Sequence, residues 1–137
     1  MKIIKLLCLF LALLALPTSL AAQDESAEAQ QYEPIFTDKD KSFLRLWYYE
    51  QVLKMNLEED QQDDYYTLLT FYTYKMTKLA LPKYGYTDAE QKQKFDELTA
   101  RLNADMKDFL SPENYKIHVE SFSNIMDKVY AKRGWTD

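Results

Sequence analysis

A chain of 137 residues with a formal net charge of −5 is long enough for one domain, and its acidity disfavours two classes of partner. Nucleic acid is excluded as a target because its binding depends on basic side chains that neutralise phosphates, and anionic lipid is disfavoured for the same reason. The single cysteine excludes a disulfide within the chain, so stability must come from a packed core or from self-association.

The first 22 residues are typical of a secretory signal peptide. Lys2 and Lys5 form a basic start, and residues 6–16 form an apolar run that is short for a membrane-spanning helix. Small residues follow this run, and we expect cleavage after Ala21 or Ala22. The chain is therefore predicted to be exported.

The cysteine, Cys8, lies inside the apolar run between Leu7 and Leu9. A lipoprotein site requires a small residue before the cysteine and a polar chain after it, so we expect no lipid and no other stable membrane anchor. Cleavage then leaves a mature chain without cysteine, which excludes thiol catalysis and thiolate metal sites.

A polar segment separates the leader from the domain. Gln23–Gln31 has no apolar period, which predicts a disordered lead-in over residues 23–36. The apolar residues of YEPIF, at positions 32–36, are expected to tether this lead-in to the fold. A single all-α domain, a helical hairpin or bundle of four helices, is predicted over residues 37–137.

Capping residues mark the first two helices. The first is predicted over about Asp38–Met55, with Thr37 as its N-cap. The second is predicted to begin at Asn56, which suits a capping box with Glu59, and to end at Leu81 before a proline. Its apolar face is expected to contain Leu57, Gln61, Tyr65, Leu68, Tyr72, Met76 and Leu79.

Two further helices follow the turn PKYGY. Thr87 and Glu90 form a capping box for the third helix. The fourth begins at Ser111, with Pro112 in its first position, and ends at Gly134. The predicted apolar faces are Phe95, Leu98, Leu102, Met106 and Phe109 in the third helix, and Tyr115, Val119, Phe122, Met126 and Val129 in the fourth.

The stretch YYTLLTFYTY, Tyr65–Tyr74, is rich in residues that favour strands. The acidic capped start and the apolar spacing of three and four residues nevertheless continue through it, and no turn residue interrupts it. We therefore predict that this stretch is helical.

No catalytic or metal-binding arrangement is recognisable. His118 is the only histidine, and its nearest acidic neighbour, Glu120, lies at the wrong helical spacing to share a site, so a structural or surface role is favoured. The acidic run Glu58–Asp64 lacks the glycine and alternating oxygen ligands of a calcium loop. No glycine-rich phosphate loop or serine nucleophile motif is present. We expect no catalytic residues, no metal and no cofactor, and predict that the protein is not an enzyme.

The first helix carries apolar residues in nearly every direction, which requires cover on all sides. Either it is the central helix of a compact bundle, or part of its surface forms a dimer interface or binds another protein. Tyr66 and Tyr74 support the second alternative, because they fall opposite the apolar face of their own helix. The candidate partner-binding residues are Phe43, Trp47, Tyr48, Tyr49, Val52, Tyr66 and Tyr74.

Three helix starts repeat one pattern of an apolar residue, a capping residue, two polar residues and an amide or acid. The copies are Leu57-Glu58-Glu59-Asp60-Gln61, Tyr86-Thr87-Asp88-Ala89-Glu90 and Leu110-Ser111-Pro112-Glu113-Asn114. The pattern resembles the L-T-x-x-Q signature of the Spy/CpxP family of bacterial periplasmic proteins. FLSPENYK, residues 109–116, is similar to the L-[ST]-P-E-Q-[YF] variant of that signature. The chain departs from the signature at Glu58, Tyr86, Glu90 and Asn114.

The resemblance implies a periplasmic protein whose helical hairpin pairs into an intertwined homodimer, although the leader also allows release from the cell. Such a protein binds partly unfolded envelope proteins, its clients, without ATP, or reports envelope stress. The motif residues would be structural, with Leu57 and Leu110 at hairpin corners, Thr87, Glu90 and Ser111 in the caps, and Gln61 and Asn114 bonded to nearby backbone. The alternative is a structural or interaction protein of the envelope whose first helix docks one dedicated partner.

Overall fold

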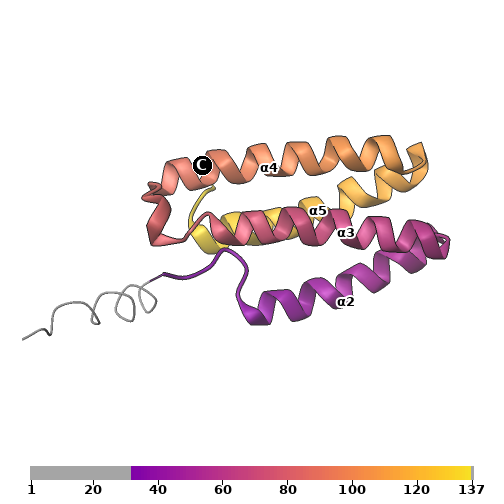
Figure 1. Cartoon of the computed structure of the whole chain (residues 1–137), viewed down its shortest axis with the longest axis horizontal. Helices are drawn as coiled ribbons and strands as arrows, with labels where there is room; N and C mark the ends of the chain where they lie inside the picture. Colours follow the sequence, from indigo (N-terminus) through magenta and orange to yellow (C-terminus); the bar gives the residue numbers. More distant parts are fainter. Residues whose placement is uncertain (1–31, 137) are drawn as a thin grey trace, which may run out of the picture. The chain divides into compact units, whose positions relative to one another are not determined.

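The computed structural model describes residues 32–136, which form four α-helices and one short 3₁₀ turn (Figure 1). The predicted all-α class is confirmed, and this described range contains no strand. The elements are α2 (Asp38–Met55), α3 (Glu59–Lys78), η1 (Pro82–Tyr84), α4 (Asp88–Phe109) and α5 (Pro112–Arg133).

Side-chain caps determine where α2, α4 and α5 begin, as predicted. The hydroxyl of Thr37 accepts a hydrogen bond from the Asp40 N–H at 3.3 Å, and the Asp40 carboxylate accepts one from the Thr37 N–H at 2.8 Å. Thr87 and Glu90 repeat this capping box at α4, and Ser111 caps α5. These residues satisfy N–H groups that have no partner within their helix.

The predicted start of the second helix at Asn56 is wrong. Asn56 has φ 48° and ψ 50°, a left-handed conformation that ends α2 and that asparagine tolerates better than most residues. The capping box lies further on, where the Gln61 side chain accepts the Glu58 N–H at 3.3 Å. α3 ends at Lys78 rather than Leu81, because a residue before proline is disfavoured in a helix and Leu81 is extended.

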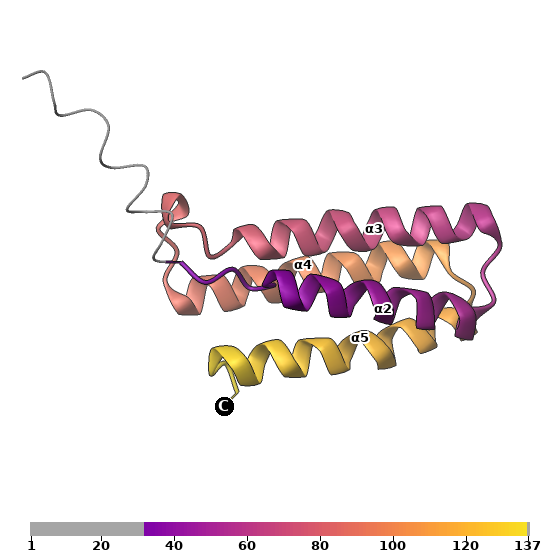
Figure 2. The same cartoon turned by 90° about the horizontal axis from the view of Figure 1, so that it is seen from below.

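The helices pack as two pairs around one core. α3 packs on α4, α2 packs on α5, and the α4–α5 hairpin links the pairs. α2 and α3 are joined by a short connection, seen at the right of Figure 2, and they diverge away from it in Figure 1. The side of the bundle between α2 and α3 is therefore less tightly packed than the side between α3 and α4.

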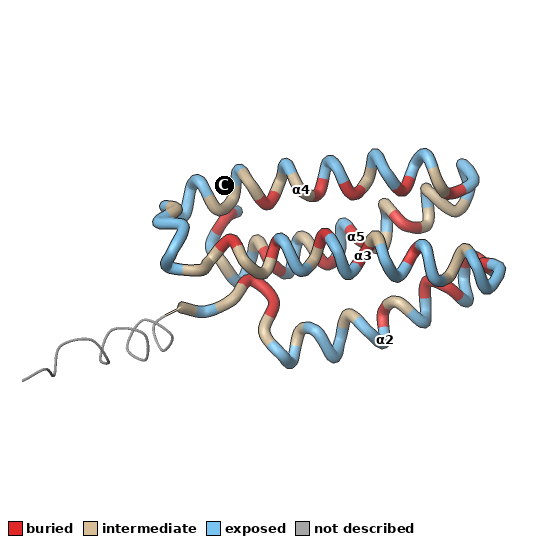
Figure 3. Tube along the Cα trace, viewed as in Figure 1, coloured by how far each residue is buried: buried red, intermediate tan, exposed pale blue. Residues whose placement is uncertain are grey.

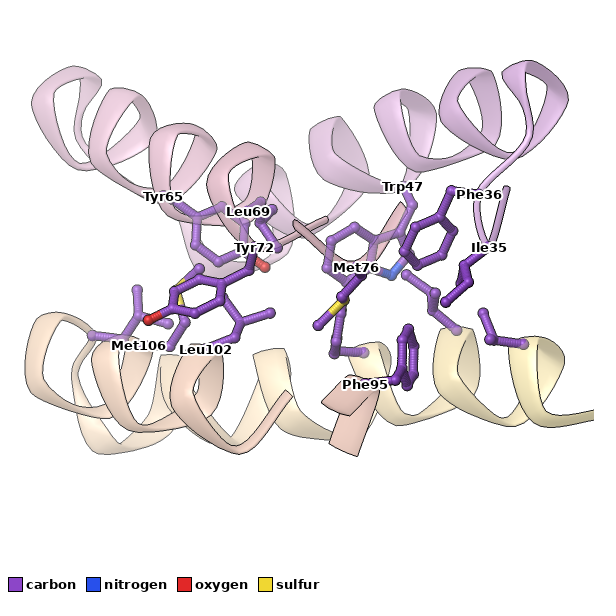
Figure 4. Packing of buried hydrophobic residues seen from close by; sticks show 14 of the residues in the cluster. Ile35, Phe36, Trp47, Tyr65, Leu69, Tyr72, Met76, Phe95, Leu102 and Met106 are labelled. Carbon is purple, nitrogen blue, oxygen red and sulfur yellow. The ribbon is translucent and has the colours of Figure 1, made fainter. Parts of the chain in front are cut away.

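Buried positions recur along the inner side of every helix (Figure 3). Three of the five residues of the predicted face of α4 are confirmed, since Phe95, Leu102 and Met106 are all 0% exposed, whereas Leu98 and Phe109 are half-buried. Opposite them, α3 contributes Tyr65 and Met76, which are also fully buried (Figure 4). Aromatic and sulfur-containing side chains from facing helices thus fill the centre of the bundle.

The predicted faces of α3 and α5 also differ in detail from those observed. In α3, Leu69 is buried while Gln61 and Leu68 are only half-buried. In α5, His118 and Ile125 belong to the core, together with the predicted Phe122 and Val129, whereas Val119 is half-buried. The apolar spacing predicts each helix, but contacts with the neighbouring helices decide which side chains of each face are buried.

The predicted disorder of residues 32–36 is contradicted. Ile35 and Phe36 are 1% and 2% exposed, and the Phe36 ring lies 6.3 Å from the Phe95 ring. Glu33 is bonded to the last residue of α5, because Arg133 Nη2 donates to the Glu33 carbonyl at 3.0 Å. We name residues 32–37 the N-terminal strap; it belongs to the domain because its apolar side chains complete the core.

Residues 1–31 lie outside the described residues, and with them the predicted signal peptide and the polar segment Gln23–Gln31. None of the helices within residues 32–136 combines the length and the apolarity that crossing a membrane requires.

Candidate binding groove

The divergence of α2 and α3 leaves a groove between them, which we name the α2/α3 groove. Its volume is about 540 Å³, the N-terminal strap borders it, and Phe122 of α5 contributes to its lining. The lining residues are Tyr32, Pro34, Phe36, Asp38, Lys41, Leu44, Arg45, Trp47, Tyr48, Tyr66, Leu69, Thr70, Thr73, Tyr74, Thr77, Lys78 and Phe122. A volume of this size suits a few side chains of a bound segment.

Buried apolar side chains line the deepest part of the groove. Trp47 of α2 lies against Phe122 of α5, with ring centroids 5.9 Å apart, and both are buried. Leu69 of α3 and Phe36 of the strap are buried beside the same groove. A ligand entering the groove would therefore meet apolar side chains that also belong to the core.

A tyrosine cluster joins α2 to α3. Tyr48 stacks on Tyr65 at 5.8 Å and meets the edge of Tyr66 at 5.2 Å. Its hydroxyl donates to the Gln62 carbonyl at 2.9 Å, and burial raises the pKa of Tyr48. Tyr48 therefore acts as an anchor between the two helices rather than as a free contact residue.

The α3 wall carries three threonines that offer no unpaired hydroxyl donor. Thr70, Thr73 and Thr77 each donate to the carbonyl of the residue four positions earlier, at 2.8, 2.7 and 2.8 Å. This bonding leaves their hydroxyl protons occupied and makes the wall less polar than its composition indicates. The exposed ring of Tyr74 stands on the same wall.

Charged residues at the groove are mainly basic, although the chain is acidic. Lys41 forms an ion pair with Asp38 at 2.9 Å. Arg45 and Lys78 have no carboxylate partner within ion-pair distance among residues 32–136, and the Lys78 ammonium lies 4.9 Å from the centre of the Tyr74 ring. The groove thus combines an apolar floor with cationic groups at its edge.

The prediction that α2 could be the enclosed central helix of the bundle is wrong. Leu46, Tyr49 and Leu53 are 71%, 59% and 80% exposed, and their spacing places them on the face of α2 opposite its buried residues. Phe43 lies at the flank of this stripe, with the Lys128 ammonium 4.5 Å above its ring. We name Phe43, Leu46, Tyr49 and Leu53 the outer stripe of α2.

The structure separates the predicted partner-binding residues into three groups. Tyr66, Tyr74 and Trp47 line the α2/α3 groove, although Trp47 is buried in its floor. Val52 is buried in the core, so its assignment as a partner contact is corrected. Tyr48 also lines the groove but acts as the anchor between α2 and α3, and Phe43 and Tyr49 lie on the outer stripe.

Sequence reasoning missed several groove residues, namely Tyr32, Pro34, Phe36, Leu44, Leu69, Thr70, Thr73 and Thr77. The predicted disordered lead-in includes these strap residues, but the burial of Ile35 and Phe36 agrees with the expected tether at YEPIF. The threonines could not be predicted as groove residues, because the sequence does not show which side of α3 faces the strap and α2.

His118 is a structural core residue. It is 0% exposed, its Nδ1 lies 3.0 Å from the Tyr65 hydroxyl, and its Nε2 lies 3.2 Å from Asn103 Oδ1. Burial lowers the pKa of His118 from 6.5 to about 4, and burial raises the pKa of Tyr65. The ring is therefore neutral at pH 7, with Nε2–H donating to Asn103 and Nδ1 accepting from Tyr65.

The repeated motif residues lie at the helix connections. Leu57 and Leu110 are buried at the α2–α3 and α4–α5 corners. Asn114 Nδ2 donates to the Met55 carbonyl at 3.1 Å, which ties the start of α5 to the end of α2. Together with the capping residues already described, these side chains stabilise the hairpin corners and leave the groove to other residues.

No three histidine, cysteine, aspartate or glutamate side chains within the described range gather closely enough to hold a metal ion. Comparison of the chain with protein-family models, curated proteins and solved structures gave no match in any of the three.

Proposed function

We propose that the protein is a Spy/CpxP-like chaperone or envelope-stress adaptor that binds partly unfolded envelope proteins without ATP. The observation that carries this proposal is the α2/α3 groove, whose apolar floor and exposed tyrosines lie at the surface of a small acidic bundle. An unfolded segment presents apolar side chains of irregular sequence, and a wide apolar groove can accept many of them.

The chemistry of the groove favours loose and adaptable contact. Tyr66 and Tyr74 supply large amphipathic rings with few rotatable bonds. The threonine hydroxyls are already bonded, so an apolar segment leaves no lining threonine hydroxyl of α3 without a partner. A wall whose threonine donors are already occupied discriminates little between apolar sequences, as a general chaperone requires.

The leader and the motif copies supply the proposed location and family. The basic and apolar pattern of residues 1–22 directs export, and the three helix starts at Leu57, Tyr86 and Leu110 carry the resemblance to periplasmic proteins. The periplasm is therefore the proposed compartment, and its clients would be other exported chains.

The outer stripe of α2 favours a second candidate function. Its residues recur at helical spacing and form a narrow apolar line that suits one helix of a dedicated partner or of a second copy of this chain. In that case the protein is a structural or interaction protein of the envelope, and the stripe rather than the groove is its working surface.

An aggregation-suppression assay with an unrelated unfolding protein tests the proposal. We expect the mature chain to suppress aggregation, and Tyr74→Ser to weaken suppression several-fold because it removes an exposed groove ring. Tyr49→Ser is the matched control, since it makes the same change at a similarly exposed site on the outer stripe.

Three results would decide against the groove as a chaperone site. Absence of suppression at molar excess would reject chaperone activity altogether. Loss of suppression in Tyr49→Ser but not in Tyr74→Ser would show that the outer stripe, and not the groove, binds the client. Complete loss of suppression in both variants, with unchanged circular dichroism, would show that the groove is not the specific client-binding surface.

A further inference from the structure

A second concavity lies on the other side of α3 from the α2/α3 groove, between the end of α3, η1 and the first half of α4. Its volume is about 400 Å³. It is lined by Tyr74, Lys75, Lys78, Leu79, Lys83, Tyr84, Tyr86, Lys94, Glu97, Leu98 and Arg101. We name it the basic pocket, because its lining contains five cationic side chains and one carboxylate.

The cations of the basic pocket have no carboxylate partners. Within residues 32–136, none of Lys75, Lys78, Lys83, Lys94 and Arg101 forms an ion pair, whereas other lysines of the chain do. Like charges gathered around one concavity repel one another, and this concentration is unexpected in a chain with a net charge of −5. An anionic ligand would relieve the repulsion.

Tyrosine rings hold the ammonium groups at the pocket. The Lys83 ammonium lies 5.1 Å from the centre of the Tyr84 ring, and the Lys94 ammonium lies 4.8 Å from that of Tyr86. The two rings stack on each other with centroids 5.4 Å apart. Exposed cation–π contacts are weak, so these ammonium groups can turn to a carboxylate at little cost.

The basic pocket and the α2/α3 groove adjoin each other at two residues of α3. Tyr74 and Lys78 line both of them, from the exposed side of α3. A segment that lies in the groove can therefore pass over Tyr74 and place its next residues at the basic pocket. The two concavities then act as two parts of one binding surface.

We propose that the preferred client segment carries apolar residues followed or preceded by a cluster of carboxylates. The apolar part occupies the α2/α3 groove, and the carboxylates bind the cations of the basic pocket. This inference rests on the proposed function of the groove and adds the charge of the client to it.

The charge of α3 also sets the direction of the bound segment. The start of α3 carries Glu58, Glu59, Asp60, Asp63 and Asp64, at the opposite end from the basic pocket. An acidic flank placed near that end is repelled, so the carboxylates of the client must lie toward the C-terminal end of α3. The charges of α3 thereby select one orientation of the client segment along the groove, whose apolar surface alone does not select one.

Binding of labelled peptides to the mature chain tests the inference. The peptides share one apolar core and carry a flank of aspartates, of serines or of lysines. At low ionic strength we expect the aspartate-flank peptide to bind about tenfold more tightly than the serine-flank peptide, since several exposed ion pairs contribute modestly each. The difference should shrink at about 0.5 M salt, where such pairs are screened.

Variants locate the effect. In Lys75→Gln/Lys83→Gln/Lys94→Gln, which changes only residues outside the groove lining, the advantage of the aspartate flank should be lost while serine-flank binding stays unchanged. The control Lys39→Gln/Lys107→Gln/Lys116→Gln removes the same charge from exposed sites outside both concavities and should keep the advantage.

The outcomes separate this inference from the proposed function. Equal affinities for aspartate and serine flanks at low salt would overturn the charge preference and leave groove binding intact. An equal loss in the control variant would overturn it too, because net charge would then explain the effect. Binding of the aspartate-flank peptide with no binding of the serine-flank peptide would support the basic pocket and contradict the groove function.

Discussion

His118 is held in the core by two neutral partners from two other helices. Tyr65 comes from α3 and Asn103 from α4, so the imidazole links three of the four helices. The sequence indicated a structural or surface histidine, but it could not name the partners, because Tyr65 lies 53 positions away along the chain. Both hydrogen bonds of His118 join different helices, so they depend on the tertiary packing and could not be predicted from the local sequence.

Acid should destabilise the fold through His118. Its pKa is about 4 in the folded state and about 6.5 when unfolded, so the unfolded chain binds more protons between these values. The contribution to the free energy of unfolding is fully present above pH 6.5 and is lost as the pH falls to about 4. We expect a loss of roughly 3 kcal/mol across this window, measured by urea unfolding at several pH values.

The variant His118→Gln isolates this effect from that of the carboxylates. Glutamine keeps hydrogen-bonding groups in the cavity but does not titrate, so the slope of stability against pH should become shallower between pH 6.5 and about 4. An identical slope in the variant and in the original chain would show that other groups carry the pH dependence.

Predictions that depend on residues close in the sequence were confirmed more often than those that depend on tertiary contacts. The caps at Thr37, Thr87 and Ser111 were predictable because each partner lies three residues away in the sequence. The assignment of Val52 to a binding surface is wrong and that of Trp47 is incomplete, because both side chains are buried and the Trp47 ring packs against Phe122 of α5. Composition alone could not show which apolar residues of α2 the bundle covers.

At the scale of elements, α3 shows how a stretch rich in tyrosine and threonine becomes a helix. Its buried residues Tyr65, Leu69, Tyr72 and Met76 recur at spacings of four and three, which only a helix places on one side. The threonines do not compete with the helix, since their hydroxyls bond carbonyls within it. Periodicity therefore outweighed residue propensity, as the sequence indicated.

The connection between α2 and α3 depends on one left-handed residue. Asn56 has φ 48°, so Asn56→Ala should lower the free energy of unfolding by about 1 kcal/mol, whereas Asn56→Gly should be neutral or stabilising. Urea unfolding measures both. Asn124→Ala is the control, because an exposed asparagine within α5 should gain about 0.5 kcal/mol from the same change.

A loss of stability in Asn56→Gly comparable to that in Asn56→Ala would contradict this account. It would show that the asparagine side chain itself, rather than the backbone conformation, stabilises the connection. The sequence suggested a capping box at Asn56, and the error arose because asparagine favours both helix starts and left-handed helix ends.

At the scale of the whole molecule, the N-terminal strap joins the start of the described domain to its last helix. Its buried Phe36 reaches α4, and Lys132 of α5 pairs with Glu33 at 2.9 Å and with Asp40 at 3.4 Å. The number and order of the helices followed from the sequence. The strap did not, because its packing requires contacts across about 100 positions of the chain.

Removing the buried ring of the strap should therefore destabilise the whole domain. We expect Phe36→Ala to cost about 3–5 kcal/mol in the free energy of unfolding, as for a fully buried phenylalanine. Phe43→Ala, the same change at a residue 45% exposed on α2, should cost less than about 1 kcal/mol. Similar losses in the two variants would argue against the strap as part of the core.

The two tryptophans of the chain occupy different environments, and this gives the protein an intrinsic optical reporter. Trp47 lines the α2/α3 groove, whereas Trp135 packs against Phe95 at 5.6 Å and donates its indole N–H to Asp88 at 2.9 Å. A ligand in the groove would change the surroundings of the first indole and leave those of the second. Emission from the unlabelled protein can therefore report on ligand entry, with Trp135 as an internal reference.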